Sequence, residues 1–199
     1  MNIFTDDKDL EWKELSKKPL LKTPIATINE SLCSSSQGIK NNYIIIDSKD
    51  WVVVVPVKND NFIMVKQWRH GEKALSIEFP GGVIESNETP EQGARRELLE
   101  ETSFTAGKMI YLGKMNPNPA FMGNHVHFFA AMDLEESGNQ HLDEDEYLNY
   151  FEMPQKTVWE KMGTSEMPHA LMAAALLFYS RFNEKTQSTD SAKNIKPAD

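Results

Sequence analysis

The amino-acid sequence predicts an α/β protein with one main domain and an N-terminal arm. Two observations support this prediction. Runs of β-branched and aromatic residues recur between clusters of turn-forming residues, which is typical of strands. Other segments carry a helix start signal or apolar residues at helical spacing. A chain of 199 residues can bury one good core, so we divide it into an arm at 1–41, a main domain at 42–183 and a tail at 184–199.

Four predicted strands precede the first helix. They are the segments 42–47, 51–57, 62–68 and 75–79, and polar turn residues separate the first three. The fourth strand runs directly into Pro80, Gly81 and Gly82. These residues predict a tight turn, in which glycine lets the backbone approach a ligand closely.

The first helix is predicted to run from Pro90 to about residue 102. Thr89 is a suitable N-cap, proline suits the first helical position, and Gln92 completes a capping-box pattern. Ala94 and Leu98 stand four residues apart and form a narrow apolar stripe. We therefore expect the helix to pack against the sheet through this stripe.

Three glutamates lie on an adjoining face of the same helix, at Glu97, Glu100 and Glu101. Like charges at this spacing cost roughly 0.2–0.5 kcal/mol per pair. A divalent cation would remove the conflict, because Mg²⁺ takes oxygen ligands and keeps positions open for water and phosphate. Arg96 can orient the carboxylates through a charge-assisted hydrogen bond. The alternative is a solvated acidic face, but the glycine turn and the spacing of the whole segment favour a functional site.

The second half of the chain continues the α/β pattern. Strands are predicted at 108–115, 125–132 and 147–153, and helices at 155–162 and 169–182. The last helix is apolar on all sides, which indicates burial against the sheet. From residue 183 onward the chain is polar, and we expect disorder. His125 and His127 could form a metal pair, but we favour satisfied or solvent-facing histidines because no third ligand stands near them.

Charge and composition restrict the partners. The net charge is −9, with 30 acidic and 21 basic residues and no basic run, so we expect no nucleic-acid partner. An anionic substrate stays compatible, since bound cations reverse the local field. Cys33 is the single cysteine, and no internal disulfide can form. The N-terminus lacks an apolar signal core and no stretch reaches transmembrane length, so we expect a cytoplasmic protein with no membrane partner.

The segment 82–104 resembles the Nudix box, the signature of hydrolases that cut diphosphate linkages. Gly82, Glu88, Arg96 and the three helix glutamates stand at the spacing of that signature, with Ser103 in place of its usual glycine. The resemblance implies the Nudix α/β/α sandwich with a mixed sheet and an N-terminal β arm. It also implies that Mg²⁺, or alternatively Mn²⁺, is bound by the Gly81 carbonyl and by the carboxylates of Glu97, Glu100 and Glu101. Glu88 and Arg96 match the supporting charge pair.

Within that family the chain looks like the ADP-ribose and nucleoside-diphosphate-sugar pyrophosphatases. The resemblance implies a nucleotide substrate, cut to a nucleoside monophosphate and a sugar phosphate, and a homodimer built through strands of the arm. Arg69 would reach the substrate phosphates, and Pro119 stands where ADP-ribose-cleaving members carry a proline. The loop 116–124 departs from the usual serine-proline-glycine pattern, which leaves the sugar open. Phe121, Asn124 and Trp51 are candidate substrate contacts, with packing as the alternative.

In this subgroup the general base tends to come from an acidic loop after the box. Here that loop is 141–146, and Glu144 and Glu146 are the candidates, with Glu100 as the fallback on the helix. A solvated loop is the alternative for either residue. Two other functions remain open: another Nudix activity, such as nucleotide-pool cleaning or RNA decapping, and a non-catalytic module that senses a ligand. The intact glutamates argue against the second.

Overall fold

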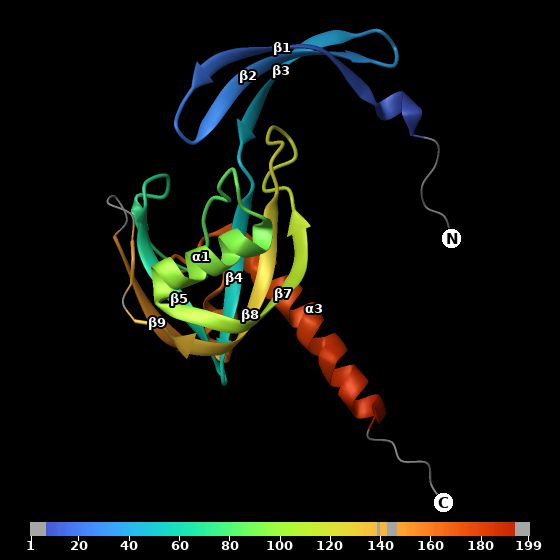
Figure 1. Cartoon of the computed structure of the whole chain (residues 1–199). Helices are drawn as coiled ribbons and strands as arrows, with labels where there is room; N and C mark the ends of the chain where they lie inside the picture. Colours follow the sequence, from blue (N-terminus) through green and yellow to red (C-terminus); the bar gives the residue numbers. More distant parts are fainter. Residues whose placement is uncertain (1–6, 139, 143–146, 194–199) are drawn as a thin grey trace, which may run out of the picture. The chain divides into compact units, whose positions relative to one another are not determined.

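The computed structural model describes residues 7–138, 140–142 and 147–193, and the chain divides into two compact units (Figure 1). The first unit holds the chain up to Lys49 together with 116–125, and the second holds 50–115 and the chain from Val126 onward. The strand predicted at 42–47 belongs to the first unit, although the sequence had assigned it to the main domain. The reason is that it pairs with the arm.

The first unit is a three-stranded antiparallel sheet. After the short 3-10 helix η1 (Lys8–Leu10), the strands β1 (Trp12–Lys22), β2 (Ala26–Ser35) and β3 (Lys40–Ser48) lie in the order β1-β2-β3. The loop 116–125 joins this unit, where the Ile46 N–H donates to the Phe121 carbonyl at 2.7 Å. Large apolar side chains remain exposed, among them Leu20, Leu21 and Ile25. The arm therefore presents more apolar surface than one sheet can cover by itself.

The second unit is built on a mixed sheet. Its strands are β4 (Trp51–Lys58), β5 (Asn61–Arg69), β6 (Ala74–Glu78), β7 (Phe104–Met115), β8 (Val126–Glu136) and β9 (Leu148–Pro154). Their order is β6-β5-β4-β8-β7, with β9 beside β5. β4 and β8 are parallel, and the other pairs are antiparallel. A mixed sheet is what the sequence predicted.

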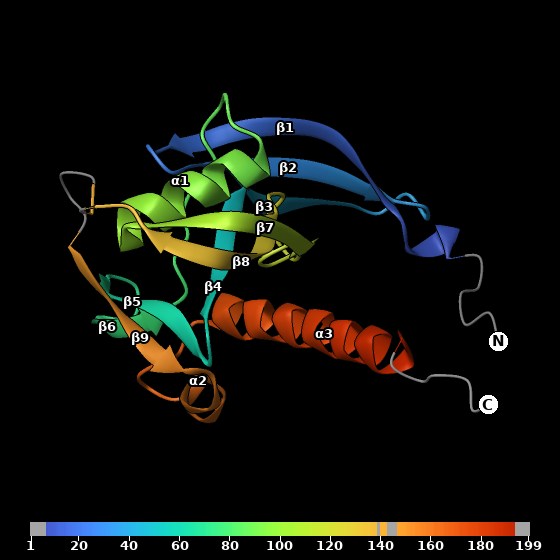
Figure 2. The same cartoon turned by 60° about the horizontal axis from the view of Figure 1, so that its bottom comes forward.

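Helices cover both faces of this sheet. α1 (Pro90–Thr102) and α3 (Ala170–Lys193) lie on opposite sides, and the short α2 (Gln155–Lys161) follows β9 (Figure 2). In β4, Val52 and Val54 join the core beneath α1, whereas Val53 and Val55 join the core beneath α3. Because successive side chains of a strand point to opposite faces, a continuous apolar strand serves two cores. The second unit is therefore an α/β/α sandwich.

The predicted elements differ from the structure mainly at their ends. β7 begins at Phe104 rather than 108, and its antiparallel pairing with Glu136 extends β8 by the same amount. α3 continues to Lys193, past the predicted end at 182, because residues such as Glu184 and Lys185 favour helix without needing burial. None of the helices in the described ranges is both long and apolar enough to span a bilayer.

Candidate functional site

The helix α1 is fixed at its start and along one side. The Thr89 side chain accepts a hydrogen bond from the Gln92 N–H at 3.3 Å, and the Gln92 side chain accepts one from the Thr89 N–H at 2.8 Å. This confirms the predicted capping box. Ala94 and Leu98 are fully buried, as the apolar stripe predicted. The glutamates of α1 therefore stand on a helix whose position is set by the core of the sheet.

The glycine turn lies alongside β4. The N–H groups of Val52 and Val54 donate to the carbonyls of Gly82 and Pro80, both at 2.9 Å. A Cβ at Gly81 would overlap with the Val52 carbonyl oxygen, and a Cβ at Gly82 would overlap with the Glu97 carboxylate. The two glycines are thus required by different neighbours, the first by the backbone of β4 and the second by a helix carboxylate.

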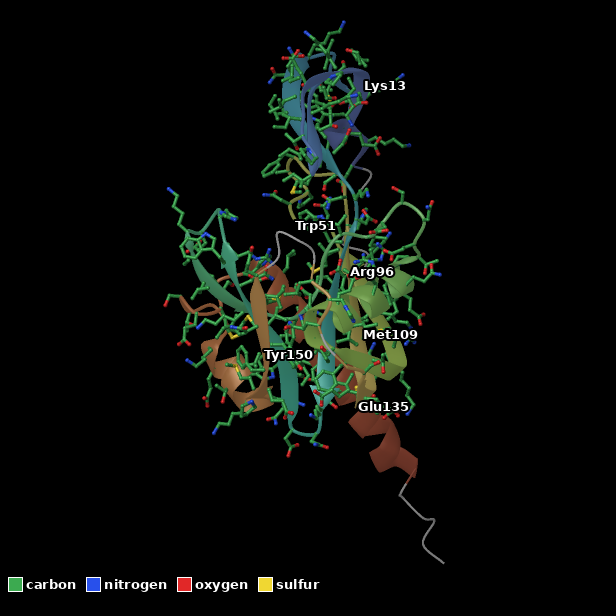
Figure 3. The ribbon with its side chains drawn as sticks, turned by 60° about the vertical axis from the view of Figure 1, so that its left-hand side comes forward. Lys13, Trp51, Arg96, Met109, Glu135 and Tyr150 are labelled. Atoms are coloured by element: carbon green, nitrogen blue, oxygen red, sulfur yellow. The ribbon has the colours of Figure 1, made fainter. Side chains whose placement is uncertain are left out.

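Arg96, labelled in Figure 3, stands on α1 and links this helix to the segment 83–88 that follows the glycine turn. Its Nε donates to Glu88 at 2.7 Å, and its Nη2 donates to Glu88 at 3.1 Å and to the Val83 carbonyl at 2.9 Å. Its Nη1 donates to Glu97 at 3.0 Å and to Glu100 at 2.9 Å. Hydrogen bonding to Glu88, followed by Glu100 and Glu97, raises the pKa of Arg96 above its usual value. The predicted Glu88–Arg96 pair is present.

The three glutamates differ in their surroundings. Glu97 is 7% exposed and Glu101 is 2% exposed, whereas the Glu100 side chain is 35% exposed. Glu101 accepts a hydrogen bond from the Gly81 N–H at 2.8 Å, which ties the end of α1 to the glycine turn. Two buried carboxylates and a backbone turn therefore meet at one place in the second unit.

The donor set suits a hard divalent cation. Within the described ranges, no three His, Cys, Asp or Glu side chains form a group that could hold a metal ion on their own. Mg²⁺ does not need such a cage, because it binds through one or two carboxylates and completes its shell with water and substrate phosphate oxygens. Arg96 contributes one positive charge against the three carboxylates it contacts. This excess of negative charge, partly buried, is what a cation would offset.

Ser103 ends the helix in the left-handed conformation, with φ of 62° and ψ of 12°. Its N–H donates to the Leu99 carbonyl at 2.8 Å. The Ser103 hydroxyl is buried and has no hydrogen-bond partner in the part of the chain that the structure describes. The position therefore has the geometry for which glycine is the usual residue, and serine adopts it at an energetic cost.

The other predicted site residues have different surroundings. Arg69 makes a bidentate pair with Glu78, from Nε at 2.8 Å and Nη2 at 2.5 Å, and Glu78 is fully buried. Trp51 packs against the core beneath α3, as its alternative role predicted. Glu144 and Glu146 lie outside the described residues.

The loop candidates Pro119, Phe121 and Asn124 belong to the first unit. Phe121 is 39% exposed, and the Asn124 side chain donates to the Lys49 carbonyl at 3.1 Å. His127 pairs with Asp50 at 3.0 Å in the second unit, while His125 belongs to the first. His127 is thus a satisfied histidine, which is the interpretation that the sequence favoured.

Sequence reasoning missed Glu78 and Asp50. Glu78 stands in the run Leu75 to Phe79, where apolar residues alternate with the polar Ser76 and Glu78, so the pattern indicates a solvent-facing side for Glu78. The structure buries it instead, and a buried carboxylate requires a partner such as Arg69, which the local pattern does not reveal. Asp50 gave no signal either, since it follows two other turn residues.

Comparisons with known proteins agree with this geometry. A model of the NUDIX domain matches residues 48–173. An ADP-ribose pyrophosphatase of Bacillus subtilis (strain 168) is 29% identical over 173 residues, which cover 86% of this chain and 94% of that protein. A methanol dehydrogenase activator of Bacillus methanolicus is 34% identical over 104 residues, which cover 51% of this chain and 56% of that protein. A solved structure of an ADP compounds hydrolase superposes with a TM-score of 0.80 at 21% identity, covering 88% of this chain and 96% of that one, and it has the same fold.

Proposed function

The chain belongs to the NUDIX family, and we propose that it hydrolyses the diphosphate bond of a nucleoside diphosphate linked to a sugar, with ADP-ribose as the first candidate. The products would be a nucleoside monophosphate and a sugar phosphate. The observation that carries this proposal is the Arg96 network, which holds Glu97 and Glu100 beside the buried Glu101. The relative of similar length named ADP-ribose pyrophosphatase supports the choice of substrate.

The Gly81 carbonyl, Glu97, Glu100 and Glu101 would hold Mg²⁺ or Mn²⁺. When bound, such cations neutralise the diphosphate, lower the pKa of a water molecule and stabilise the leaving phosphate. The residues of the chain orient this site. Arg96 fixes one oxygen each of Glu97 and Glu100, and the Gly81 N–H fixes one oxygen of Glu101. These bonds set the directions of the carboxylates before substrate enters.

Arg69 is our candidate for contact with the substrate phosphates. Its guanidinium is held in a fixed plane by two bonds to Glu78, and its side chain is 42% exposed. A planar, immobilised guanidinium loses little further entropy when it binds a phosphate oxygen.

Glu144 and Glu146 remain our candidates for the general base, with Glu100 as the alternative. A positioned base contributes about 10²–10⁴-fold to turnover. Each of the three is changed to glutamine, and kcat and KM are measured at saturating Mg²⁺. The base is the residue whose replacement lowers kcat within that range while KM stays unchanged. If Glu144→Gln and Glu146→Gln both keep wild-type turnover, the base is not in that loop.

We also propose that the chain forms a homodimer through the arm. The first unit, which contains the arm, exposes several large apolar side chains on β1, on β3 and on the turns beside β2, namely Trp12, Leu15, Leu20, Leu21, Ile25, Ile39, Tyr43 and Ile44. A patch of this kind on a sheet favours association with a second copy.

The test is a substrate screen with Mg²⁺. ADP-ribose, sugar nucleotides, dinucleoside polyphosphates and nucleoside triphosphates are compared, and released phosphomonoesters are measured. Glu101→Gln serves as the matched control, because it keeps the shape of the side chain but removes its charge. We expect hydrolysis of a sugar nucleotide that requires the metal and is nearly abolished in Glu101→Gln at an unchanged melting temperature. Faster turnover of a nucleoside triphosphate than of every sugar nucleotide, or full activity in excess chelator, contradicts the proposal.

A further inference from the structure

A cavity of about 470 Å³ lies at the β5–β6 hairpin of the second unit, outside the carboxylates of α1. Its walls include Trp68, Arg69, Ser76, Glu78 and His169. Its volume lies within the range of about 300–1,000 Å³ that is typical of small-molecule sites. Glu78 ends β6, three residues before Gly81, so one wall of the cavity continues along the chain into the glycine turn.

The cavity is closed on one side by the segment that precedes α3. The Ile77 N–H donates to the Glu166 carbonyl at 2.9 Å, and Met167 is fully buried, so this segment is held beside β6. The Nδ1 of His169 accepts a hydrogen bond from the Leu171 N–H at 3.1 Å. Burial also lowers the pKa of His169 below its usual value, which keeps the ring neutral near pH 7. A neutral ring with Nδ1 as acceptor carries its proton on Nε2, so His169 offers one donor besides its capping bond.

The other polar side chains that line the cavity include both hydrogen-bond donors and acceptors. Arg69 and Glu78 stand side by side as a bidentate pair. The Ser76 hydroxyl is buried and faces Glu78, whose pKa it helps to lower. Trp68, 48% exposed, supplies an aromatic wall.

The charge of the lining argues against an anion. Arg69 contributes one positive charge, while Glu72 and Glu78 contribute two negative charges, and His169 is neutral. Arg69 can contact one phosphate oxygen of the substrate, but a free anion inside the cavity would meet a net negative wall. A sugar ring suits the wall better, since its C–H faces lie well on an indole ring and its hydroxyls both donate and accept.

We propose that this cavity binds the sugar that is attached to the nucleoside diphosphate, with Trp68 beneath the ring and His169 and Ser76 bonded to its hydroxyls. The assignment rests on the proposed function, because it names the part of that substrate which the cavity holds. It makes Trp68 and His169 residues that determine specificity for the sugar. Neither touches the reacting phosphates, so their contacts are the same in the ground state and the transition state.

The test uses His169→Asn, Trp68→Ala and the control Leu75→Ala. Asparagine is a favourable N-cap residue, so it keeps the bond to Leu171, and its shorter side chain withdraws the donor from the position that Nε2 of His169 occupies. Leu75 is the cross-strand neighbour of Trp68, is also half-exposed and does not line the cavity. For ADP-ribose we expect His169→Asn to raise KM about five- to tenfold with kcat unchanged, and Leu75→Ala to leave both within twofold. The inhibition constant of ribose 5-phosphate should rise by the same factor, whereas that of AMP stays within twofold.

Other outcomes overturn the inference. An equal loss of AMP affinity would place the nucleoside in the cavity, and equal competition by inorganic phosphate would make it an anion site. Unchanged constants in both variants would remove the cavity from the substrate site. If the wild-type protein cleaves no sugar nucleotide, the proposed function fails. The binding of ribose 5-phosphate, measured by calorimetry, then still tests whether the cavity holds a sugar. Binding to wild type that is lost in His169→Asn supports a sugar pocket, while no binding to wild type at millimolar concentration excludes it.

Discussion

Ser103→Gly should stabilise the protein, although it removes a side chain at a buried position. Ser103 holds φ at 62°, and a non-glycine residue loses about 1 kcal/mol in that region. Its hydroxyl is buried without a partner in the described chain, which costs about 1 kcal/mol at the low end of such values. Glycine reduces this gain by about 0.5–1 kcal/mol, because it gives the unfolded chain greater conformational freedom. The net expectation is a stabilisation of about 1 kcal/mol.

This gain can be measured in two ways. Urea unfolding should show a higher midpoint with an unchanged slope, and the melting temperature should rise by about 2–4 °C for a chain of this size. Ser103→Ala is the matched control, because it removes the hydroxyl and keeps the Cβ in the left-handed conformation. It should recover only the part of the gain that comes from the hydroxyl. Turnover should stay at the wild-type value in both variants, because the hydrogen bonds of Ser103, from its N–H to Leu99 and to its carbonyl from Ser137, belong to the backbone and not to the side chain.

The result that would refute the reasoning is a Ser103→Gly protein that is no more stable than wild type. In that case the left-handed conformation carries no strain at this helix end. Equal stability of Ser103→Gly and Ser103→Ala would mean that the strain relieved by glycine is offset by the greater freedom of its unfolded chain, so that the net gain equals that of removing the hydroxyl.

Three further predictions concern the glycine turn, the buried ion pair and the arm. Gly81→Ala should lower the melting temperature, because the added Cβ overlaps with the backbone of β4. Gly82→Ala should mainly lower activity, because the added Cβ displaces the Glu97 carboxylate. Equal effects of the two variants on the melting temperature would contradict this difference. Burial acts to raise the pKa of Glu78, but hydrogen bonding to Arg69 outweighs it and the pKa lies below its usual value of 4.5. As the pH falls, Glu78 is therefore protonated in the unfolded chain before it is protonated in the folded protein. The contribution of this ion pair to the free energy of unfolding is present above about pH 4.5 and is lost as the pH falls through the lower folded pKa. Urea unfolding at several acidic pH values should show a steeper loss of stability for wild type than for Glu78→Gln. Deletion of residues 1–40 should give monomers or insoluble protein, as measured by light scattering, and a monomeric full-length chain would remove the arm as a dimer interface.

The sequence was sufficient for the features that depend on local rules. The capping box at Thr89, the stripe of Ala94 and Leu98 and the bounds of α1 follow from chemistry within a few residues, and all are present. The partner of Arg69 could not be found in this way. Glu78 stands nine residues away on the next strand, and its burial depends on how the β5–β6 hairpin and the segment before α3 meet. The role of β3 was missed for the same reason, because strand patterns do not say which sheet a strand joins.

Arg69 and Arg96, both in the second unit, illustrate how similar side chains perform different tasks. Arg96 has five N–H donors, and all five are bonded to Glu88, Glu97, Glu100 and the Val83 carbonyl. It therefore has no donor left for a substrate, and its task is to hold the carboxylates in place. Arg69 pairs with the carboxylate of Glu78 through its Nε and Nη2, and its side chain is 42% exposed. Loss of Arg96 would release three carboxylates at once and disturb binding of the metal, whereas loss of Arg69 would leave the carboxylates of α1 as they are. A variant Arg96→Lys, which keeps the charge but not the five donors, should therefore behave like the loss of a metal ligand rather than the loss of a substrate contact.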